Sequence, residues 1–213
     1  MVERNHGFPT KPQSYATLER ISLAVRRSLL PDLGEIDGVP GVTLFEHLDD
    51  LTIDLGDVQV GVNYAVNPLP AGIEGLTVFD EERHEVVVVL DPDTYISLVA
   101  KDPRALFCLC HEIGHACIHT RVLMRLSRIP HSLAALHRGE IPQHKVFEDT
   151  EWQANAFAAA FLAPALGLIQ LERRKGIITP EMLKRQYNTS PDTARFRIDI
   201  FQRRREELFK IGY

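Results

Sequence analysis

The segment from Asp102 to about His119 constrains this chain more than any other, because both its helical start and its reactive side chains are visible in the sequence. Asp102 followed by Pro103 is typical of a helix start, with Asp as the cap and Pro at the first helical position. Within this helix stands the pentapeptide His111-Glu112-Ile113-Gly114-His115. Residues i and i+4 of a helix project from one face, so the two imidazoles can bind one ion.

Glu112 suggests what such an ion would do. It lies about 100° around the helix from His111, near enough to touch a water at the metal without being a ligand. Zinc would lower the pKa of that water to about 7, and Glu112 would take its proton. The alternative is a pair of core or surface histidines that bind no metal; the capped amphipathic helix around them favours the metal site.

A catalytic zinc needs three protein ligands and one open position. Arg121 excludes a third His six residues after His115, and His119, one turn beyond His115, is expected to support the site rather than to bind the metal. Glu151, in the first turn of a second helix, is the better candidate, and Asn155 one turn later suits the orientation of a ligand His. Glu151 can also simply complement the helix dipole. The other donors in this region are Glu148, Asp149, His131, His137 and His144.

These residues form a pattern that is similar to a known family. The pentapeptide, followed by Glu151-x-x-Ala154-Asn155-x-Phe157-Ala158 and Phe161-Leu162-x-Pro164, closely resembles the ImmA/IrrE family of zinc metallopeptidases. The similarity extends over most of residues 75–200, including Arg104-x-x-Phe107-x-x-Cys110, Tyr187-Asn188-Thr189-Ser190 and Ala194-Arg195-Phe196. The resemblance implies a gluzincin-like site in which His111, His115 and Glu151 bind Zn²⁺ and Glu112 is the general base.

Two features depart from that family. The interval from His115 to Glu151 is longer than expected, which predicts an insertion within residues 121–147 that forms a lid or a partner contact. The N-terminus shows no helix-turn-helix motif, so a DNA-binding partner would have to be a separate chain.

Elsewhere the sequence predicts a mixture of strands and helices. Residues 14–30 have helical periodicity, the apolar pieces at 42–45, 51–55 and 58–62 predict short strands, and residues 75–79 and 85–90 predict a strand pair. Residues 91–93 end that pair. Beyond residue 119 we expect a separate helix and a loop through residue 147, then a helix at 151–162 that ends at Pro164. Thr179-Pro180 and Ser190-Pro191 begin two more helices.

The predicted fold class is therefore α+β and, by resemblance, zincin-like, with a small antiparallel or mixed sheet on an active-site helix and further helices at the C-terminus. We expect a single metallopeptidase domain over residues 1–213. Its parts are an N-terminal helix (1–35), an acidic strand-rich part (36–100), the zinc-site helices (101–170) and a helical tail (171–213).

Composition points to the cytoplasm. Three Cys residues are too few for a disulfide framework, and the first ten residues lack the apolar core of a secretory signal. The apolar stretch 154–169 is interrupted by Asn155, Pro164 and Gly167, so we expect no membrane span there. Cys108, Cys110 and Cys117 lie close to the histidines in sequence, but they point in different directions from a helix. We therefore expect them to pack in the core.

Charge is distributed unevenly along the chain. Residues 31–100 hold fifteen acidic residues against Arg83 alone, although the net charge of the chain is only −5. The simplest explanation is a solvated acidic face; the alternative is a surface that attracts a basic partner. The tail is rich in Arg, but it also has core-like apolar positions and the chain as a whole is not basic, so direct binding of nucleic acid is not expected.

The leading hypothesis is a zinc endopeptidase in which strand 85–90 offers an edge to an extended substrate. The oxyanion donor stays open among Tyr95, His131, His144 and Tyr187. The resemblance implies cleavage of a cognate helix-turn-helix repressor, a basic DNA-binding protein, which would derepress genes of a mobile element or a stress response. The alternative is a non-catalytic regulatory module of a toxin–antitoxin-like pair with a structural zinc. Glu112 separates the two, because a structural site needs no unliganded carboxylate.

Overall fold

Four short strands form one mixed sheet. Its order is β1 (Thr52–Asp54), β2 (Gln59–Val66), β4 (Glu85–Leu90) and β3 (Gly75–Asp80). β2 and β4 are parallel, whereas β1 and β3 run antiparallel to their neighbours. The computed structural model describes residues 7–128 and 144–210, and within them β3 is an edge strand of the sheet.

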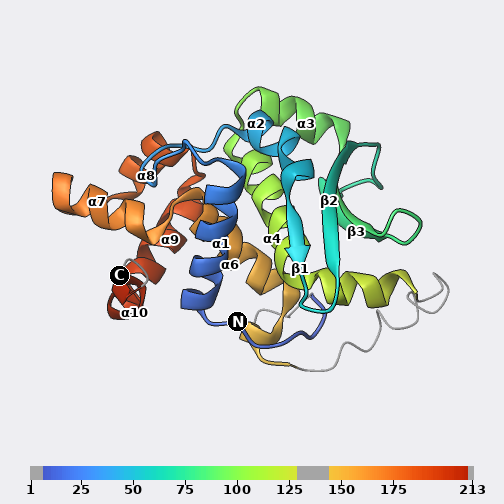
Figure 1. Ribbon diagram of the computed structural model, residues 1–213. Helices are drawn as coiled ribbons and strands as arrows, with labels where there is room; N and C mark the ends of the chain where they lie inside the picture. Colours follow the sequence, from blue (N-terminus) through green and yellow to red (C-terminus); the bar gives the residue numbers. More distant parts are fainter. Residues whose placement is uncertain (1–6, 129–143, 211–213) are drawn as a thin grey trace.

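The long helix α4 (Pro103–Ser127) lies against this sheet and connects it to the helical part. It packs on β3, β4 and α6 (Thr150–Leu162), and α1 (Tyr15–Leu29) packs on α6 in turn. Figure 1 shows α4 running behind the strands, with α1 and α6 beside it. The main hydrophobic cluster fills the space among these elements, and Val86, Leu109, Ile113 and Phe157 are fully buried within it.

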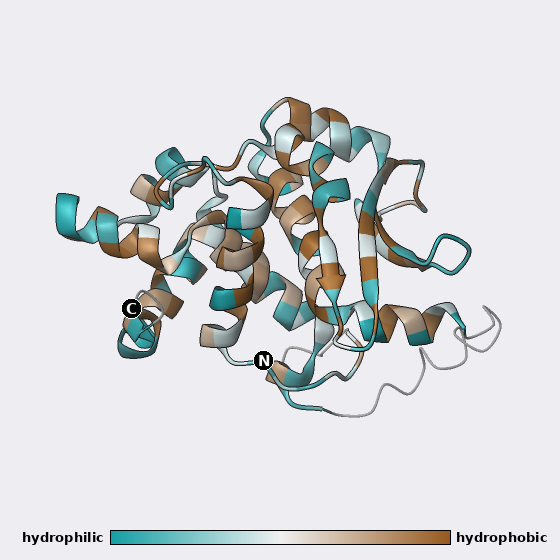
Figure 2. Cartoon of the chain, viewed as in Figure 1, coloured by the Kyte–Doolittle hydropathy of each residue, from teal (hydrophilic) through white to brown (hydrophobic). Residues whose placement is uncertain are grey.

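The C-terminal helices surround a second hydrophobic cluster on the far side of α1 from the sheet (Figure 1). They are α7 (Ala165–Lys175), α8 (Pro180–Tyr187), α9 (Pro191–Arg203) and α10 (Arg205–Phe209). Figure 2 shows hydrophobic residues where the sheet, α4 and α6 meet, and hydrophilic residues at the outer end of α7 and in the turn between β3 and β4. The remaining elements are α2 (Gly41–Glu46), η1 (Leu48–Asp50), α3 (Pro92–Val99) and η2 (Val146–Glu148).

The α+β class, the mixed sheet and the helices at 14–30, 151–162, 180–187 and 191–203 are confirmed. The strand prediction for residues 42–45 is wrong, because this segment forms α2, whose buried Leu44 and Phe45 suit a helix as well as a strand. The prediction that a helix ends near residue 119 is also wrong. No Gly or Pro occurs between His119 and Ser127, so α4 continues to Ser127. The helices α3, α7 and α10 were not predicted. Part of the proposed insertion, residues 129–143, lies outside the described residues.

Strand 85–90 is not an edge, which corrects a further prediction. β4 is paired on both sides, with β2 and with β3, so its main-chain groups are not available to a substrate. The sequence shows which segments are strands but not their order, and the hairpin between β3 and β4 places β3 outermost.

Within residues 7–128 and 144–210, no single helix is long and apolar enough to cross a membrane. The bent pair α6 and α7, which meet at 43°, passes the same test of length and composition when taken together.

Candidate metal centre

Two helices bring the predicted site residues together. Asp102 caps α4 by accepting hydrogen bonds from the N–H groups of Arg104 and Ala105, and α4 then presents His111 and His115 on one face. Asp149 caps α6 in the same way and places Glu151 in its first turn. Because Asp149 and Glu151 are two residues apart, the cap fixes the start of the helix at the point where the carboxylate is needed.

The two helices approach closely at Gly114, within the pentapeptide. A Cβ atom at this position would lie 3.1 Å from Cδ1 of Phe157 and 3.2 Å from Cα of Ala154. Both of those atoms belong to α6, and Cα of Ala154 is main chain that a rotamer change cannot move. The absence of a side chain at Gly114 therefore lets α6 lie near enough to α4 for Glu151 to reach the histidines.

His111, His115 and Glu151 converge on one point. Nε2 of His111 lies 3.0 Å from Nε2 of His115 and 3.2 Å from Oε2 of Glu151, and Nε2 of His115 lies 3.3 Å from Oε1 of Glu151. Ligand atoms about 2.0–2.1 Å from a tetrahedral zinc ion stand roughly 3.3 Å apart. The three side chains thus match the ligand spacing of a zinc site, and among the described residues they form the one such group of three donors.

Glu112 lies beside this cluster but does not belong to it. The hydroxyl of Thr77, on edge strand β3, donates to Oε2 of Glu112 at 2.7 Å and also lies 3.0 Å from the main-chain oxygen of Glu112. Both residues are less than a tenth exposed. The carboxylate is therefore held in one orientation, with one oxygen engaged by Thr77.

Asn155 orients His111. Its Oδ1 lies 3.0 Å from Nδ1 of His111. An amide oxygen only accepts, so Nδ1 of His111 carries a proton and Nε2 is the ring nitrogen that faces Glu151. This is the contact expected of a residue that supports a metal ligand.

His119 lies behind His115. Its Nδ1 is 3.1 Å from Nδ1 of His115, and its Nε2 is 3.1 Å from Oε1 of Gln153. His119 is almost fully buried, and Gln153 is fully buried. His119 thus contacts His115 but is not itself one of the three clustered donors.

The surroundings shift the pKa values of these groups. The imidazoles of His111 and His115 hold the pKa of the Glu151 carboxyl well below its usual range. Burial disfavours the charged form of His111, but Glu151 and Glu112 outweigh it and raise the pKa of His111. Burial and the neighbouring His115 lower the pKa of His119 to about 4, so its ring is neutral near pH 7.

The rival donors take other roles. Glu148 accepts from the N–H of Lys145 and is half-buried. Asp149 caps α6 and pairs with Nε2 of His144 at 2.9 Å. His131 and His137 lie outside the described residues. The three cysteines are free thiols that pack in or against the main hydrophobic cluster, as expected.

The candidate oxyanion donors are not gathered at the cluster in the described part of the chain. Tyr187 is fully buried in the second hydrophobic cluster and donates to the main-chain oxygen of Glu35 at 3.2 Å. Tyr95 packs against Phe45. His144 pairs with Asp149, and His131 lies outside the described residues.

Thr77 and Gln153 were not predicted from the sequence. A single Thr on a strand 35 positions before Glu112 carries no spacing signal. Gln153 lies within the recognised helix motif, but as one of its unspecified positions. Only the packing of β3 on α4, and of α6 on α4, brings these side chains to the site.

Comparison with known proteins adds one finding. A family model, Peptidase_M78, described as the IrrE N-terminal-like domain, matches residues 95–199. This span runs from within α3 into α9 and contains His111, Glu112, His115 and Glu151. The comparison with curated proteins found no match.

Proposed function

We propose, from the premise that the chain belongs to the Peptidase_M78 family through its IrrE N-terminal-like domain, that it is a zinc-dependent endopeptidase. One observation carries the proposal: two imidazoles and a carboxylate from two helices meet at ligand spacing, and a separate buried carboxylate lies next to them. A structural zinc site is closed by four protein ligands, whereas this group offers three.

The residues of the chain divide the chemistry among them. A bound zinc ion would act as a Lewis acid toward the scissile carbonyl and would lower the pKa of an attacking water. Glu112 would accept the proton of that water at the carboxylate oxygen that Thr77 does not hold, and would pass it to the leaving amine. Asn155 would keep His111 in the tautomer that binds metal.

Edge strand β3 is the natural partner for an extended substrate. It packs on α4 and bears Thr77, whose hydroxyl contacts Glu112. A peptide that pairs with the outer edge of β3 would place its main chain alongside the base.

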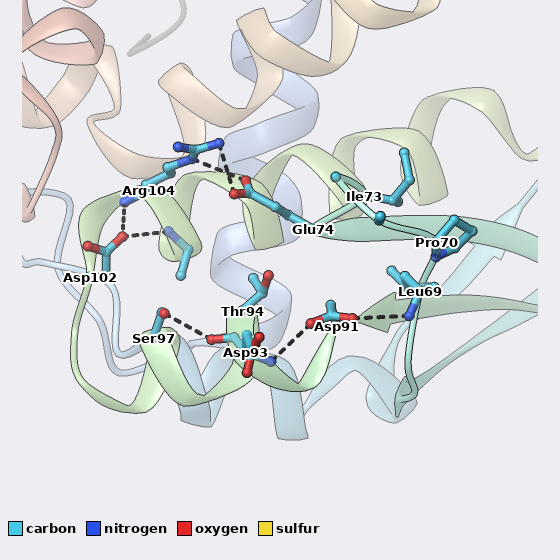
Figure 3. A pocket seen from close by; sticks show the side chains of 13 residues that line it. Leu69, Pro70, Ile73, Glu74, Asp91, Asp93, Thr94, Ser97, Asp102 and Arg104 are labelled. Atoms are coloured by element: carbon cyan, nitrogen blue, oxygen red, sulfur yellow. Dashed lines mark hydrogen bonds and ion pairs between the residues drawn. The ribbon is translucent and has the colours of Figure 1, made fainter.

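Acidic groups stand at both ends of β3. Glu74 precedes the strand, and Asp80, Glu81 and Glu82 follow or end it. At the Glu74 end lies a pocket of about 500 Å³ between the start of α4 and the loop before β3. Figure 3 shows Glu74 paired with Arg104, the carboxylate of Asp102 beside Arg104, and the carboxylates of Asp91 and Asp93 on the other side of the pocket.

This charge favours a basic substrate. Four carboxylates against one guanidinium give the pocket a negative potential. The pocket lies close to the proposed base, because Arg104 in its wall stands eight residues before Glu112, about 12 Å along the helix. A basic helix-turn-helix repressor, whose cleavage would derepress genes, is the substrate we propose. The setting we propose is the cytoplasm.

The first experiment tests the activity. Purified protein should contain close to one equivalent of zinc and should cut a repressor encoded beside it at one position. Glu112→Gln should retain the metal and the fold but lose cleavage. If Glu112→Gln leaves function intact, the protein is a regulatory binding module with a structural zinc instead.

The second experiment tests the substrate class. Two loop peptides of equal length, one basic and one acidic, are offered to the zinc-loaded enzyme at low salt. We expect faster cleavage of the basic peptide, with a preference that weakens as salt screens the charges. Equal rates for the two peptides would refute the charge argument without affecting the peptidase assignment.

A further inference from the structure

The N-terminal segment of residues 7–13, here called the strap, is bonded to the chain just before Glu151. The N–H of Gly7 donates to Oδ2 of Asp149, and the N–H of Phe8 donates to Oγ1 of Thr150. Further main-chain bonds join Thr150 N–H to Phe8 O at 3.1 Å, Thr10 N–H to Glu148 O at 2.7 Å and Gln13 N–H to Phe147 O at 3.1 Å. The strap therefore fixes the first turn of α6.

Contact at the end of the strap is tight. A Cβ atom on Gly7 would lie 2.6 Å from Oγ1 of Thr150 and 2.8 Å from the main-chain N of Glu151. The second of these atoms belongs to the backbone of a residue in the candidate metal cluster. A larger residue at position 7 would have to displace either the strap or the start of α6.

Gln153 connects the strap to the interior. Its Nε2 donates to the main-chain oxygens of Lys11 and Phe147, at 2.8 Å each. Two acceptors for the two amide hydrogens leave no freedom to rotate the amide, so Oε1 must face His119. Gln153 is fully buried, and an alternative orientation would leave these groups without partners.

The orientation of Gln153 decides two tautomers in succession. Oε1 of Gln153 accepts, so Nε2 of His119 carries its proton and Nδ1 of His119 is an acceptor. Nδ1 of His115, 3.1 Å away, must then carry a proton and donate. The lone pair of His115 is thereby assigned to Nε2, the atom that faces His111 and Glu151.

We propose that Gln153 is a positioning residue for the metal centre, which acts through His119 on His115. Because Gln153 also donates to the Lys11 carbonyl, this chain of hydrogen bonds makes the strap part of that centre. The proposal rests on the proposed function only in taking zinc as the ion. It assigns a role to the hydrogen-bonded chain from the Lys11 carbonyl through Gln153 and His119 to His115.

The test uses the full chain and needs no substrate. In metal-free protein, long-range ¹H–¹⁵N NMR of the imidazoles should show the Nε2–H tautomer for His119 and the Nδ1–H tautomer for His115. Gln153→Met keeps the length of the side chain and removes its polar groups, so both histidines should lose their single tautomer. Its zinc affinity, measured by competition with a chromogenic chelator, should fall roughly tenfold to a hundredfold.

Gln186→Met is the matched control. Gln186 also donates its amide to a main-chain oxygen, that of Ile36, but it lies on α8. This variant should retain the zinc affinity and both histidine tautomers. A melting scan of each metal-free variant separates loss of affinity from loss of fold.

Two further variants keep the proposal falsifiable if Gln153→Met fails to fold. His119→Phe preserves a ring at that position but removes the acceptor for His115, and Gly7→Val disturbs the strap where it contacts the start of α6. Both should weaken zinc binding. The proposal is overturned if the wild-type His115 is protonated at Nε2, or if all three variants bind zinc as tightly as the wild type. A wild type that shows these tautomers but binds no zinc would refute the peptidase and not the hydrogen-bonded chain.

Discussion

Oδ1 of Asn155 lies 3.0 Å from Nδ1 of His111, so one turn of α6 carries both the carboxylate of the metal cluster and the group that orients one of its imidazoles. Asn155→Ala would remove that acceptor and leave either tautomer of His111 accessible. We expect the affinity for zinc to fall roughly tenfold to a hundredfold, measured by chelator competition. Asn155→Asp keeps an acceptor in place and should retain most of the affinity. Equal affinity in the Ala variant would contradict the role of Asn155.

Gly114→Ala tests the close approach of α4 and α6. In an ordinary helix this change stabilises by about 1 kcal/mol, because Ala has the higher helix propensity. Here the added Cβ would meet Phe157 and the Cα of Ala154, so α6 must move away. We expect a lower melting temperature and weaker zinc binding in the same variant.

Gly61→Ala is the control for that substitution. Nothing lies within 4 Å of a Cβ at Gly61, which is on β2, so the change should leave zinc binding unaltered. A Gly114→Ala protein that melts at a higher temperature than the wild type would show that α4 and α6 can accommodate a Cβ at position 114 without moving apart.

Much of the site could be predicted from the sequence because its signals are local. The spacing of His111 and His115 and the cap at Asp102 are contained within a single helix, and the resemblance to a family strengthened Glu151, already the better candidate by its place in the next helix. What could not be predicted depends on tertiary contacts. Thr77 reaches Glu112 only because β3 is outermost and packs on α4, and strand order is not encoded in strand periodicity.

The helices likewise divide into those that a local sequence signal predicted and those that it did not. Cap-plus-Pro pairs correctly marked the starts of α4, α8 and α9, but the equivalent pair Asp91-Pro92 was interpreted only as the end of a strand, so α3 was missed. Residues 42–45 are too short and too apolar for periodicity to distinguish helix from strand. The contacts of the strap with residues 147–150 span more than 130 positions and have no sequence signature.

Thr77→Val should lower kcat and leave KM nearly unchanged. Valine has a similar shape but cannot donate to Oε2 of Glu112, so the carboxylate loses the bond that orients it. Loss of a hydrogen bond to a charged group predicts a decrease of about tenfold or more in kcat, measured with the basic peptide. Thr77→Ser should restore it.

Thr120→Val provides the comparison. Thr120 is also buried, on α4, and its hydroxyl bonds the main-chain oxygen of Ala116 rather than Glu112. Its kcat should stay near that of the wild type. A similar loss in both variants would attribute the Thr77 effect to general destabilisation.

Cys108 should be unreactive in the folded protein. Burial, aided by the nearby carboxylates of Glu112 and Glu74, raises the pKa of Cys108 to about 12. The thiolate is therefore scarce at pH 8, whereas an unfolded thiol has a pKa of about 8.5. Iodoacetamide should label Cys108 slowly in buffer and rapidly in urea, as read by mass spectrometry, with Cys108→Ser identifying the peptide.

The raised pKa of Cys108 also makes the free energy of unfolding depend on pH. A thiol whose pKa is raised by folding favours the folded state fully below about pH 8.5 and loses that contribution as pH rises toward its folded value. The wild type should therefore lose stability above pH 8.5 more steeply than Cys108→Ser. Rapid labelling of Cys108 at pH 8 would contradict its buried, protonated state.

Glu19 and Arg197 form a buried ion pair that joins the helical tail to α1. Nη2 of Arg197 lies 2.6 Å from Oε2 of Glu19, and both side chains are about 2–3% exposed. The same Glu19 accepts from the N–H of Ala165 at the start of α7, and Nε of Arg197 donates to the oxygen of Ala163. Arg197→Met would leave a buried carboxylate without its partner and should cost about 3–5 kcal/mol in urea unfolding.

Combining that change with Glu19→Met should recover part of the loss, because the double variant buries no unpaired charge, although Ala165 still loses its acceptor. Arg205→Ala is the exposed counterpart: its pair with Glu172 is solvated and should contribute no more than about 1 kcal/mol. If Arg197→Met is no more costly than Arg205→Ala, the tail is held to α1 by its hydrophobic cluster alone and the buried pair adds nothing.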